Sequence, residues 1–176
     1  MGAKDIPYKK MKVENRKKFI YSSLIIIIIF FLDRFSKIYI ISLTKINSSV
    51  DIFVTKYLNI YLIWNEGIEF GLLSFNQSNI YIAITALIGI ILIVVLVLIV
   101  KTNDIRFYFY SFVFGGAIGN FFDRLYYSAV PDFIDLHINN YHWFIFNVAD
   151  IFITVGVMCL ILVELIFNKS LDNEKK

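Results

Sequence analysis

Apolar side chains dominate four long stretches of the 176-residue chain, and polar side chains collect between them. The stretches cover roughly residues 19–41, 80–100, 107–126 and 146–167. The second contains no charge and, as an α-helix rising ~1.5 Å per residue, is about 31 Å long, which matches the hydrocarbon core of a bilayer. The pattern predicts an all-α membrane protein with four transmembrane helices.

The segment 42–79, between the first two spans, is too long for a simple turn. Its residues 50–64 are rich in Val, Ile, Phe, Tyr and Thr, alternate partly between apolar and polar, and precede a turn-like Asn65-Glu66-Gly67. These features predict one or two β-strands. We interpret residues 1–176 as one domain, with a basic tail at 1–18, a β-rich segment at 42–79 and a second tail at 168–176.

Composition and charge place this domain relative to the membrane. Apolar residues make up 59% of the chain, above the share usual for a soluble domain. Lys and Arg collect in the two tails and in the 101–106 turn, whereas the opposite side carries only Lys45 and Lys56. The positive-inside rule therefore predicts that both termini are cytoplasmic and that 42–79 and 127–145 face outward.

Ionisable and amide side chains within the spans lie mainly toward the outer side. Such groups cost free energy inside a membrane, so they often mark a functional site. Most are three or four residues apart, so that they share a helix face. They are Asp33 and Lys37 in the first span, Asn120, Asp123 and Arg124 in the third, Asn147 and Asp150 in the fourth, and Asp132 and Asp135 between the last two. If these faces converge, they form an outer polar pocket.

Paired carboxylates are the chemistry that this pocket offers. Two nearby aspartates share one proton, so that one activates water while the other protonates a carbonyl oxygen. We expect neither a cofactor nor a metal, because His137 and His142 lack further ligands at a suitable spacing. The simpler alternatives are solvated carboxylates at the membrane edge and structural ion pairs, Asp33 with Lys37 and Asp123 with Arg124.

Four groups of motifs resemble those of the bacterial lipoprotein signal peptidases. The family pattern D-x-x-x-K matches 33–37 (DRFSK), and N-x-G-x-x-F-G matches 65–71 (NEGIEFG). The pattern GN-x-x-DR, followed by V-x-D-F, matches 119–124 (GNFFDR) and 130–133 (VPDF), and FN-x-AD matches 146–150 (FNVAD). All of them occur in the family's order. Any one motif is weak evidence, but the ordered set is specific. Three departures are Ser128 in place of a common Gly, Pro131, and Glu69.

The resemblance implies an aspartyl membrane peptidase with four helices and an outer β-cradle. Its catalytic pair corresponds to Asp132 and Asp150. The supporting or substrate-binding positions implied by the motifs are Asn65, Gly67, Asn120, Asp123, Arg124, Asn147, Asp33 and Lys37.

The implied substrates are prolipoproteins cleaved on the amino side of a diacylglyceryl-modified Cys. The implied location is the bacterial inner membrane, with the active site at the outer face, membrane lipid and substrate as partners, no nucleic acid, and a monomeric state. We expect the substrate to enter laterally along an apolar groove. The alternative function is that of a small ion- or proton-conducting membrane protein, which would spread its acidic groups across the bilayer.

Overall fold

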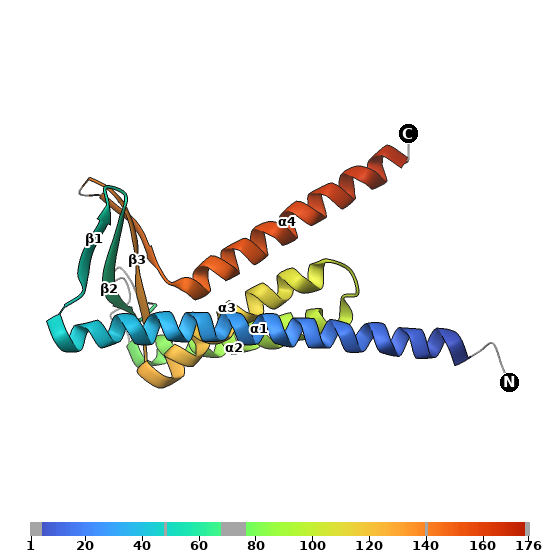
Figure 1. Ribbon diagram of the computed structural model, residues 1–176, viewed down its shortest axis with the longest axis horizontal. Helices are drawn as coiled ribbons and strands as arrows, with labels where there is room; N and C mark the ends of the chain where they lie inside the picture. The colour runs from blue at the N-terminus through green and yellow to red at the C-terminus, as the bar shows by residue number, and fades with distance from the viewer. Residues whose placement is uncertain (1–4, 48, 68–76, 140, 175–176) are drawn as a thin grey trace.

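The computed structural model describes residues 5–47, 49–67, 77–139 and 141–174, and within them a helical bundle carries a small sheet at one end (Figure 1). In chain order the elements are α1 (Asp5–Asn47), β1 (Asp51–Thr55), β2 (Leu58–Asn65), α2 (Gln77–Lys101), α3 (Arg106–Tyr127), β3 (Val130–Ile138), β4 (Tyr141–Phe146) and α4 (Val148–Glu174). The beginning of α1 and the end of α4 both lie at the end of the molecule away from the sheet. The protein is therefore mostly helical with a small antiparallel sheet.

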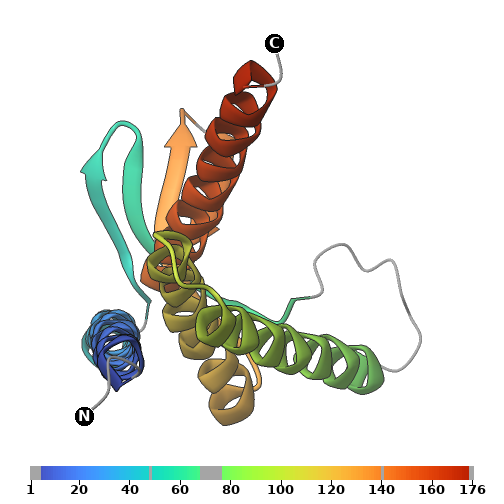
Figure 2. The same cartoon turned by 90° about the vertical axis from the view of Figure 1, so that its right-hand side faces the viewer.

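Helix α3 is the centre of the bundle and packs against α1, α2 and α4 (Figure 2). Glycines on its surface permit the close approach. A Cβ added to Gly116 would collide with the Ala149 carbonyl of α4, and one added to Gly119 would lie 2.6 Å from Asp33 Oδ2 of α1. The polar residues of three helices are thereby brought to the same level of the bundle.

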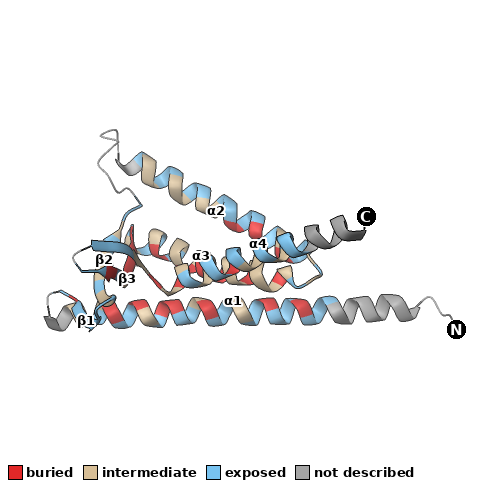
Figure 3. Cartoon of the chain, turned by 90° about the horizontal axis from the view of Figure 1, so that it is seen from above, coloured by how far each residue is buried: buried red, intermediate tan, exposed pale blue. Residues whose placement is uncertain are grey.

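Buried positions of α1 recur along its length (Figure 3), and several of them carry charged side chains. In α1 the charged side chains of Asp33, Arg34 and Lys37 are buried, while Phe31 and Phe35 are exposed. Among the described residues, two helical segments are long and apolar enough to cross a membrane, Asn79–Lys101 and Val148–Ile166. Apolar surface facing outward around a charged interior suits a lipid environment, in which buried charges must be paired.

The sheet is antiparallel throughout, in the order β1-β2-β3-β4. Its register places Ile63 of β2 opposite Asp132 of β3. An apolar cluster joins the sheet to the end of α1, with Ile40, Val50 and Phe133 buried at its centre. The strand that carries Asp132 is consequently held against the helices.

The expected and observed elements agree in most places. The strands expected within 50–64 are confirmed as β1 and β2, whereas the outer connection 127–145 is mainly the β3–β4 hairpin. Residues 5–18 and 168–174 of the two expected tails continue α1 and α4. Ser128, directly after α3, has a φ of 60°, a left-handed conformation in which glycine carries no Cβ penalty.

Candidate active site

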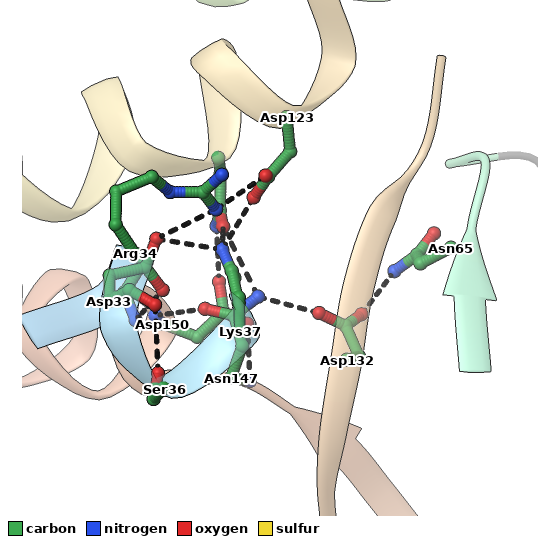
Figure 4. A network of polar contacts seen from close by, with 11 residues as sticks. Asp33, Arg34, Ser36, Lys37, Asn65, Asp123, Asp132, Asn147 and Asp150 are labelled. Carbon is green, nitrogen blue, oxygen red and sulfur yellow. Dashed lines mark hydrogen bonds and ion pairs between the residues drawn. The ribbon is translucent and has the colours of Figure 1, made fainter. Parts of the chain in front are cut away.

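Asp132 lies on β3, near the point where the sheet meets the helices (Figure 4). Its carboxylate is 2% exposed and accepts a hydrogen bond at 2.9 Å from Asn65 Nδ2 on the neighbouring strand β2. Asn65 Oδ1 in turn accepts a 2.7 Å bond from the backbone N–H of Gly67, whose φ of +78° suits glycine. Asn65 is thus oriented by its own turn to donate to Asp132.

Asp150 is fixed by the beginning of α4. Asn147 precedes the helix, and its Oδ1 accepts the backbone N–H of Asp150 at 3.1 Å, while Asp150 Oδ2 accepts the backbone N–H of Asn147 at 3.1 Å. This reciprocal pair is a capping box, which satisfies donors that would otherwise be unpaired at a helix start. The same interaction that begins the helix therefore orients the carboxylate.

The amide groups of Asn147 and Asn120 link the two aspartates. Asn147 Nδ2 donates to Asp132 Oδ1 at 2.6 Å and to Asn120 Oδ1 at 3.2 Å, and Asn120 Nδ2 donates to Asp150 Oδ1 at 2.7 Å. Four elements, β2, β3, α3 and the start of α4, contribute to this unit. The structure brings Asp132 and Asp150 into one hydrogen-bonded network.

Lys37 of α1 contacts this network through Asn120. Its ammonium group is fully buried and donates to Asn120 Oδ1 at 2.8 Å, Asp33 Oδ2 at 2.9 Å and Asp123 Oδ2 at 2.6 Å. The Asp33–Lys37 ion pair expected from their spacing is therefore present. Asp33 Oδ1 also accepts the backbone N–H of Ala149 at 3.1 Å, which ties α1 to the first turn of α4.

The ion pair expected between Asp123 and Arg124 is wrong. Asp123 instead forms salt bridges with Lys37 and with Arg34 of α1, while the guanidinium of Arg124 lies beside Gly67. Sequence reasoning left out Arg34, although its position inside an apolar span was a signal that it needs a buried partner. Two cations and two anions (Lys37, Arg34, Asp33 and Asp123) make this cluster formally neutral.

Arg124, near the end of α3, lies close to the turn that follows β2. Its Nη2 would be 3.7 Å from a Cβ added to Gly67, so the guanidinium lies beside the Asn65 turn. Its backbone carbonyl accepts a hydrogen bond from the Tyr81 hydroxyl of α2. Arg124 therefore approaches the strand residues rather than the buried ion cluster.

The environment of Asp132 favours its protonated form. Burial raises the pKa of this carboxyl to about 6, and the charge of Asp150 acts in the same direction. Hydrogen bonds from Asn65 and Asn147, and the charge of Lys37, oppose the increase. Asp132 therefore keeps its proton at weakly acidic pH, up to about 6, where an ordinary aspartate is ionised.

An apolar groove with a volume of about 470 Å³ leads to Asp150. It lies between the β3–β4 hairpin and α4, and its lining residues are Leu136, Phe144, Phe146, Asp150, Ile151, Thr154 and Val155. Asp150 is the single charged residue of this lining. The groove has the character expected for lateral entry of an apolar substrate segment.

Other polar residues lie apart from the network. Asp135 is fully buried and contacts His142 Nδ1 at 2.8 Å. Glu164 of α4 pairs with Arg106 of α3 at 3.5 Å. Within the described ranges, no group of three or more His, Cys, Asp or Glu side chains is arranged to hold a metal ion. Glu69 lies outside the described residues.

Comparisons with known proteins agree on one family. Residues 25–167 match the family model described as signal peptidase (SPase) II. Proteins named lipoprotein signal peptidase are similar to this chain: that of Pelagibacter ubique (strain HTCC1062) is 54% identical over 161 residues, or 92% of this chain and 97% of its own length. That of Anaplasma phagocytophilum (strain HZ) is 38% identical over 152 residues, or 85% of this chain and 94% of its own length.

A solved structure has a similar fold. A bacterial membrane enzyme determined at 1.9 Å resolution by the in meso method superimposes with a TM-score of 0.68 and 33% sequence identity. The match covers 82% of this chain and 92% of that one. The fold of this chain is therefore similar to that of a bacterial membrane enzyme.

Proposed function

This chain belongs to the signal peptidase II family, and on that premise we propose that Asp132 and Asp150 are the aspartate pair with which it hydrolyses its substrates. The function is that of a lipoprotein signal peptidase, a membrane protease whose substrates are prolipoproteins. The observation that carries the proposed pair is the amide bridge, in which Asn147 donates to Asp132 and caps the helix turn that holds Asp150. The family favours this function over ion or proton conduction.

Asp132 is the proposed general acid, and Asp150 the proposed general base. The raised pKa of Asp132 supports the first role. Asp150 lies in the first turn of α4, where unpaired backbone N–H groups interact favourably with negative charge. In this assignment Asp150 takes a proton from water, the water oxygen attacks the scissile carbonyl carbon, and Asp132 protonates the carbonyl oxygen.

The tetrahedral gem-diol then collapses. Protonated Asp150 gives its proton to the leaving nitrogen, the C–N bond breaks, and a hydroxyl of the gem-diol returns its proton to Asp132. The products are a carboxylic acid on the signal peptide and a free amine on the mature lipoprotein. Asn65, Asn120, Asn147 and Gly67 orient the pair, Arg124 borders it, and Asp33, Lys37 and Asp123 hold the helices beneath it.

The proposed substrate carries a diacylglyceryl group on the Cys that follows the cleaved bond. The apolar groove beside Asp150 supports this, because it offers apolar contacts next to a reacting carboxylate. In our proposal the signal helix and the lipid remain in the bilayer and enter laterally along this groove. The chain needs no metal for this chemistry, since water is activated by a carboxylate.

The proposed arrangement in the membrane has four spans in the bacterial inner membrane, with both termini in the cytoplasm and the sheet outside. The inverted burial of α1 supports a lipid environment for a helix that also contains charges. The positions of the helix ends on the side away from the sheet support a common side for the termini. The working unit in this proposal is a monomer.

Replacing either aspartate tests the proposed chemistry. Asp132→Asn and Asp150→Asn should each reduce cleavage of a diacylglyceryl-modified prolipoprotein by at least roughly 10²- to 10⁴-fold, because an amide neither accepts nor donates the required proton. Cleavage is measured by gel shift with the purified protein in detergent micelles, in the presence of a chelator.

The control is Asp104→Asn. Asp104 lies in the turn between α2 and α3, pairs with Arg106 at 2.7 Å, and makes the same change in charge far from the sheet. This variant should cleave at the wild-type rate. Full activity in a folded Asp132→Asn or Asp150→Asn protein would refute the proposed pair.

A further inference from the structure

A cavity at the end of the bundle away from the sheet takes no part in the proposed chemistry. Its volume is about 410 Å³, and it lies between α1, the turn after α2 and the beginning of α3 (Figure 1). The polar side chains that line it are those of Asn15, Lys17, Lys18, Tyr21, Asn103 and Tyr108. Two cations and several hydrogen-bond donors therefore meet in one cavity.

Lys18 supplies positive charge to this cavity from a fixed position. It is 7% exposed, and its ammonium group donates to the carbonyl oxygens of Val100 at 2.8 Å and Thr102 at 2.9 Å and to Asn103 Oδ1 at 3.0 Å. These acceptors lie at or just beyond the end of α2, where the helix dipole favours a cation. All three are neutral oxygens, so these bonds do not neutralise the charge of Lys18.

The charges around the cavity favour an anion. Lys17 is exposed beside Lys18, so its ammonium group can donate to a ligand. The acidic Asp104 of the turn is paired with Arg106 at 2.7 Å. The bordering segments 14–18 and 101–106 contain five basic residues and two acidic ones, namely Arg16, Lys17, Lys18, Lys101 and Arg106 against Glu14 and Asp104.

The cavity lies at the level expected for lipid headgroups. Lys18 directly precedes the first apolar stretch, and the carbonyl groups that it contacts lie at the end of the segment Asn79–Lys101, which is long enough to cross a membrane. Tyr21 and Tyr108 suit this level, because tyrosine places an apolar ring and a polar hydroxyl at the boundary between lipid and water. The abundant anion there is the phosphate of a phospholipid, and basic pockets between spanning helices bind such headgroups.

An apolar strip continues from the cavity along α1. Lys17, Tyr21, Leu24 and Ile28 are three or four residues apart, so they share one face of the helix. Tyr21, Leu24 and Ile28 are each about half exposed. A phospholipid whose phosphate lies in the cavity can place an acyl chain along this strip, which a free phosphate ion cannot do. The strip therefore favours a lipid as the occupant.

We propose that this cavity binds the phosphate of an anionic phospholipid. Lys17 donates to the phosphate, Lys18 adds its charge, and Asn15 and Tyr108 provide further donors. A bound lipid connects α1 to the turn after α2 at the end of the bundle that lacks the sheet. This inference depends on the membrane location of the family and is independent of the proposed aspartate pair.

Native mass spectrometry of the purified full-length protein tests the site. The protein is titrated in neutral detergent with phosphatidylglycerol, which is anionic, or with phosphatidylcholine of the same acyl chains, which is zwitterionic. The salt concentration is about 0.15 M, at which charges more than ~8 Å apart are largely screened. The wild-type protein should bind one phosphatidylglycerol about fivefold more tightly than phosphatidylcholine, the size expected of one lysine near an anionic headgroup. An excess of inorganic phosphate should leave the lipid bound.

Two variants connect this preference to the cavity. Lys17→Gln should reduce the preference for phosphatidylglycerol toward one. Arg16→Gln is the matched control, because it removes the same charge from the adjacent residue, which does not line the cavity, and it should keep the preference. Both positions are exposed, so neither change depends on tolerance of a buried substitution.

Three results would refute the lipid site. The first is equal affinity of the wild-type protein for the two lipids, and the second is displacement of the lipid by inorganic phosphate. The third is an equal effect of Lys17→Gln and Arg16→Gln on the preference, which would indicate a diffuse attraction to the basic tail instead of binding in the cavity.

Discussion

At the scale of single residues, the side chain of Asn147 makes three separate contacts that position the site. Its Oδ1 caps α4, its Nδ2 donates to Asp132, and the same Nδ2 contacts Asn120. It is fully buried, so each of these polar atoms needs its partner. The aspartates are consequently positioned by amides, which orient carboxylates without adding a positive charge that would favour two ionised carboxylates.

The raised pKa of Asp132 predicts a dependence of stability on pH. The folded protein binds this proton with a pKa of about 6 instead of the ordinary 3.8, so this contribution to the free energy of unfolding is fully present below pH 3.8 and is lost as the pH rises through about 6. Asp132→Asn removes the titrating group. Between about pH 4 and pH 8, the free energy of unfolding of wild type should therefore fall relative to the variant by about 2.4 kcal/mol.

Thermal unfolding of both proteins in the same detergent across this pH range measures the difference. The wild-type-minus-variant difference in the free energy of unfolding is compared between two pH values. Any pH-independent effect of the Asn side chain on stability cancels in this comparison. A wild-type-minus-variant difference that stays flat over the range would show that burial does not raise the proton affinity of Asp132.

At the scale of elements, the site depends on how closely α3 approaches α1 and α4. The cluster of Lys37, Asp33 and Asp123 joins α1 to α3, and the Asp33–Ala149 bond joins α1 to α4. Removing one member would leave a buried charge unpaired, which costs several kcal/mol. The small residues of α3 allow these polar contacts to form at ordinary hydrogen-bond distances.

Gly119→Ala should disrupt this approach. The new Cβ would lie 2.6 Å from Asp33 Oδ2, and Asp33 cannot move freely because Lys37 and the Ala149 N–H hold it. We expect a loss of about 1–3 kcal/mol in stability, together with reduced cleavage.

Gly89→Ala on α2 is the matched control. Its Cβ would lie 3.5 Å from the Phe121 ring, an ordinary contact, so the variant should be neutral or gain about 0.5–1 kcal/mol from better helix propensity. Both effects are measured by thermal unfolding in detergent. Equal stability of the two variants would show that the α1–α3 spacing does not depend on Gly119.

At the scale of the whole molecule, the interior is polar and the helix surfaces are apolar. Lys37, Asp33, Asp123 and Asn147 are all fully buried, while α2 and α4 expose most of their apolar side chains. In lipid, close packing at small residues together with polar contacts between the helices holds such a bundle together. The sheet projects from one end of this bundle, and Asp132 lies where the two parts join.

The proposed topology predicts which positions an impermeant reagent reaches. With Cys159→Ala as background, single cysteines are placed by Trp143→Cys on β4 and by Lys101→Cys at the end of α2, both exposed positions. A membrane-impermeant maleimide should label the first in intact cells, and the second only after permeabilisation. The reverse pattern would refute the proposed orientation.

The sequence alone predicted the helices and the first two strands, because apolar length and alternation are local properties, whereas the proposed aspartate pair came from the resemblance to the family's motifs. Its ordered motifs indicated the family that the comparisons then showed. Spacing along one helix also predicted the Asp33–Lys37 pair correctly.

Only the tertiary structure decided which groups meet across elements. Lys37, one of the two partners of Asp123 on α1, is 86 residues away from it in sequence, and the Asn65–Asp132 bond joins positions 67 apart. The β3–β4 hairpin was missed because β3 contains Pro131 and is buried along most of its length, so that it lacks a clear alternation of apolar and polar residues, and because its cross-strand contacts are non-local. The cavity beside Lys17 and Lys18 likewise became visible only when folding placed α1 next to the turn after α2, since a cavity is formed by the surroundings of a residue and not by the residue itself.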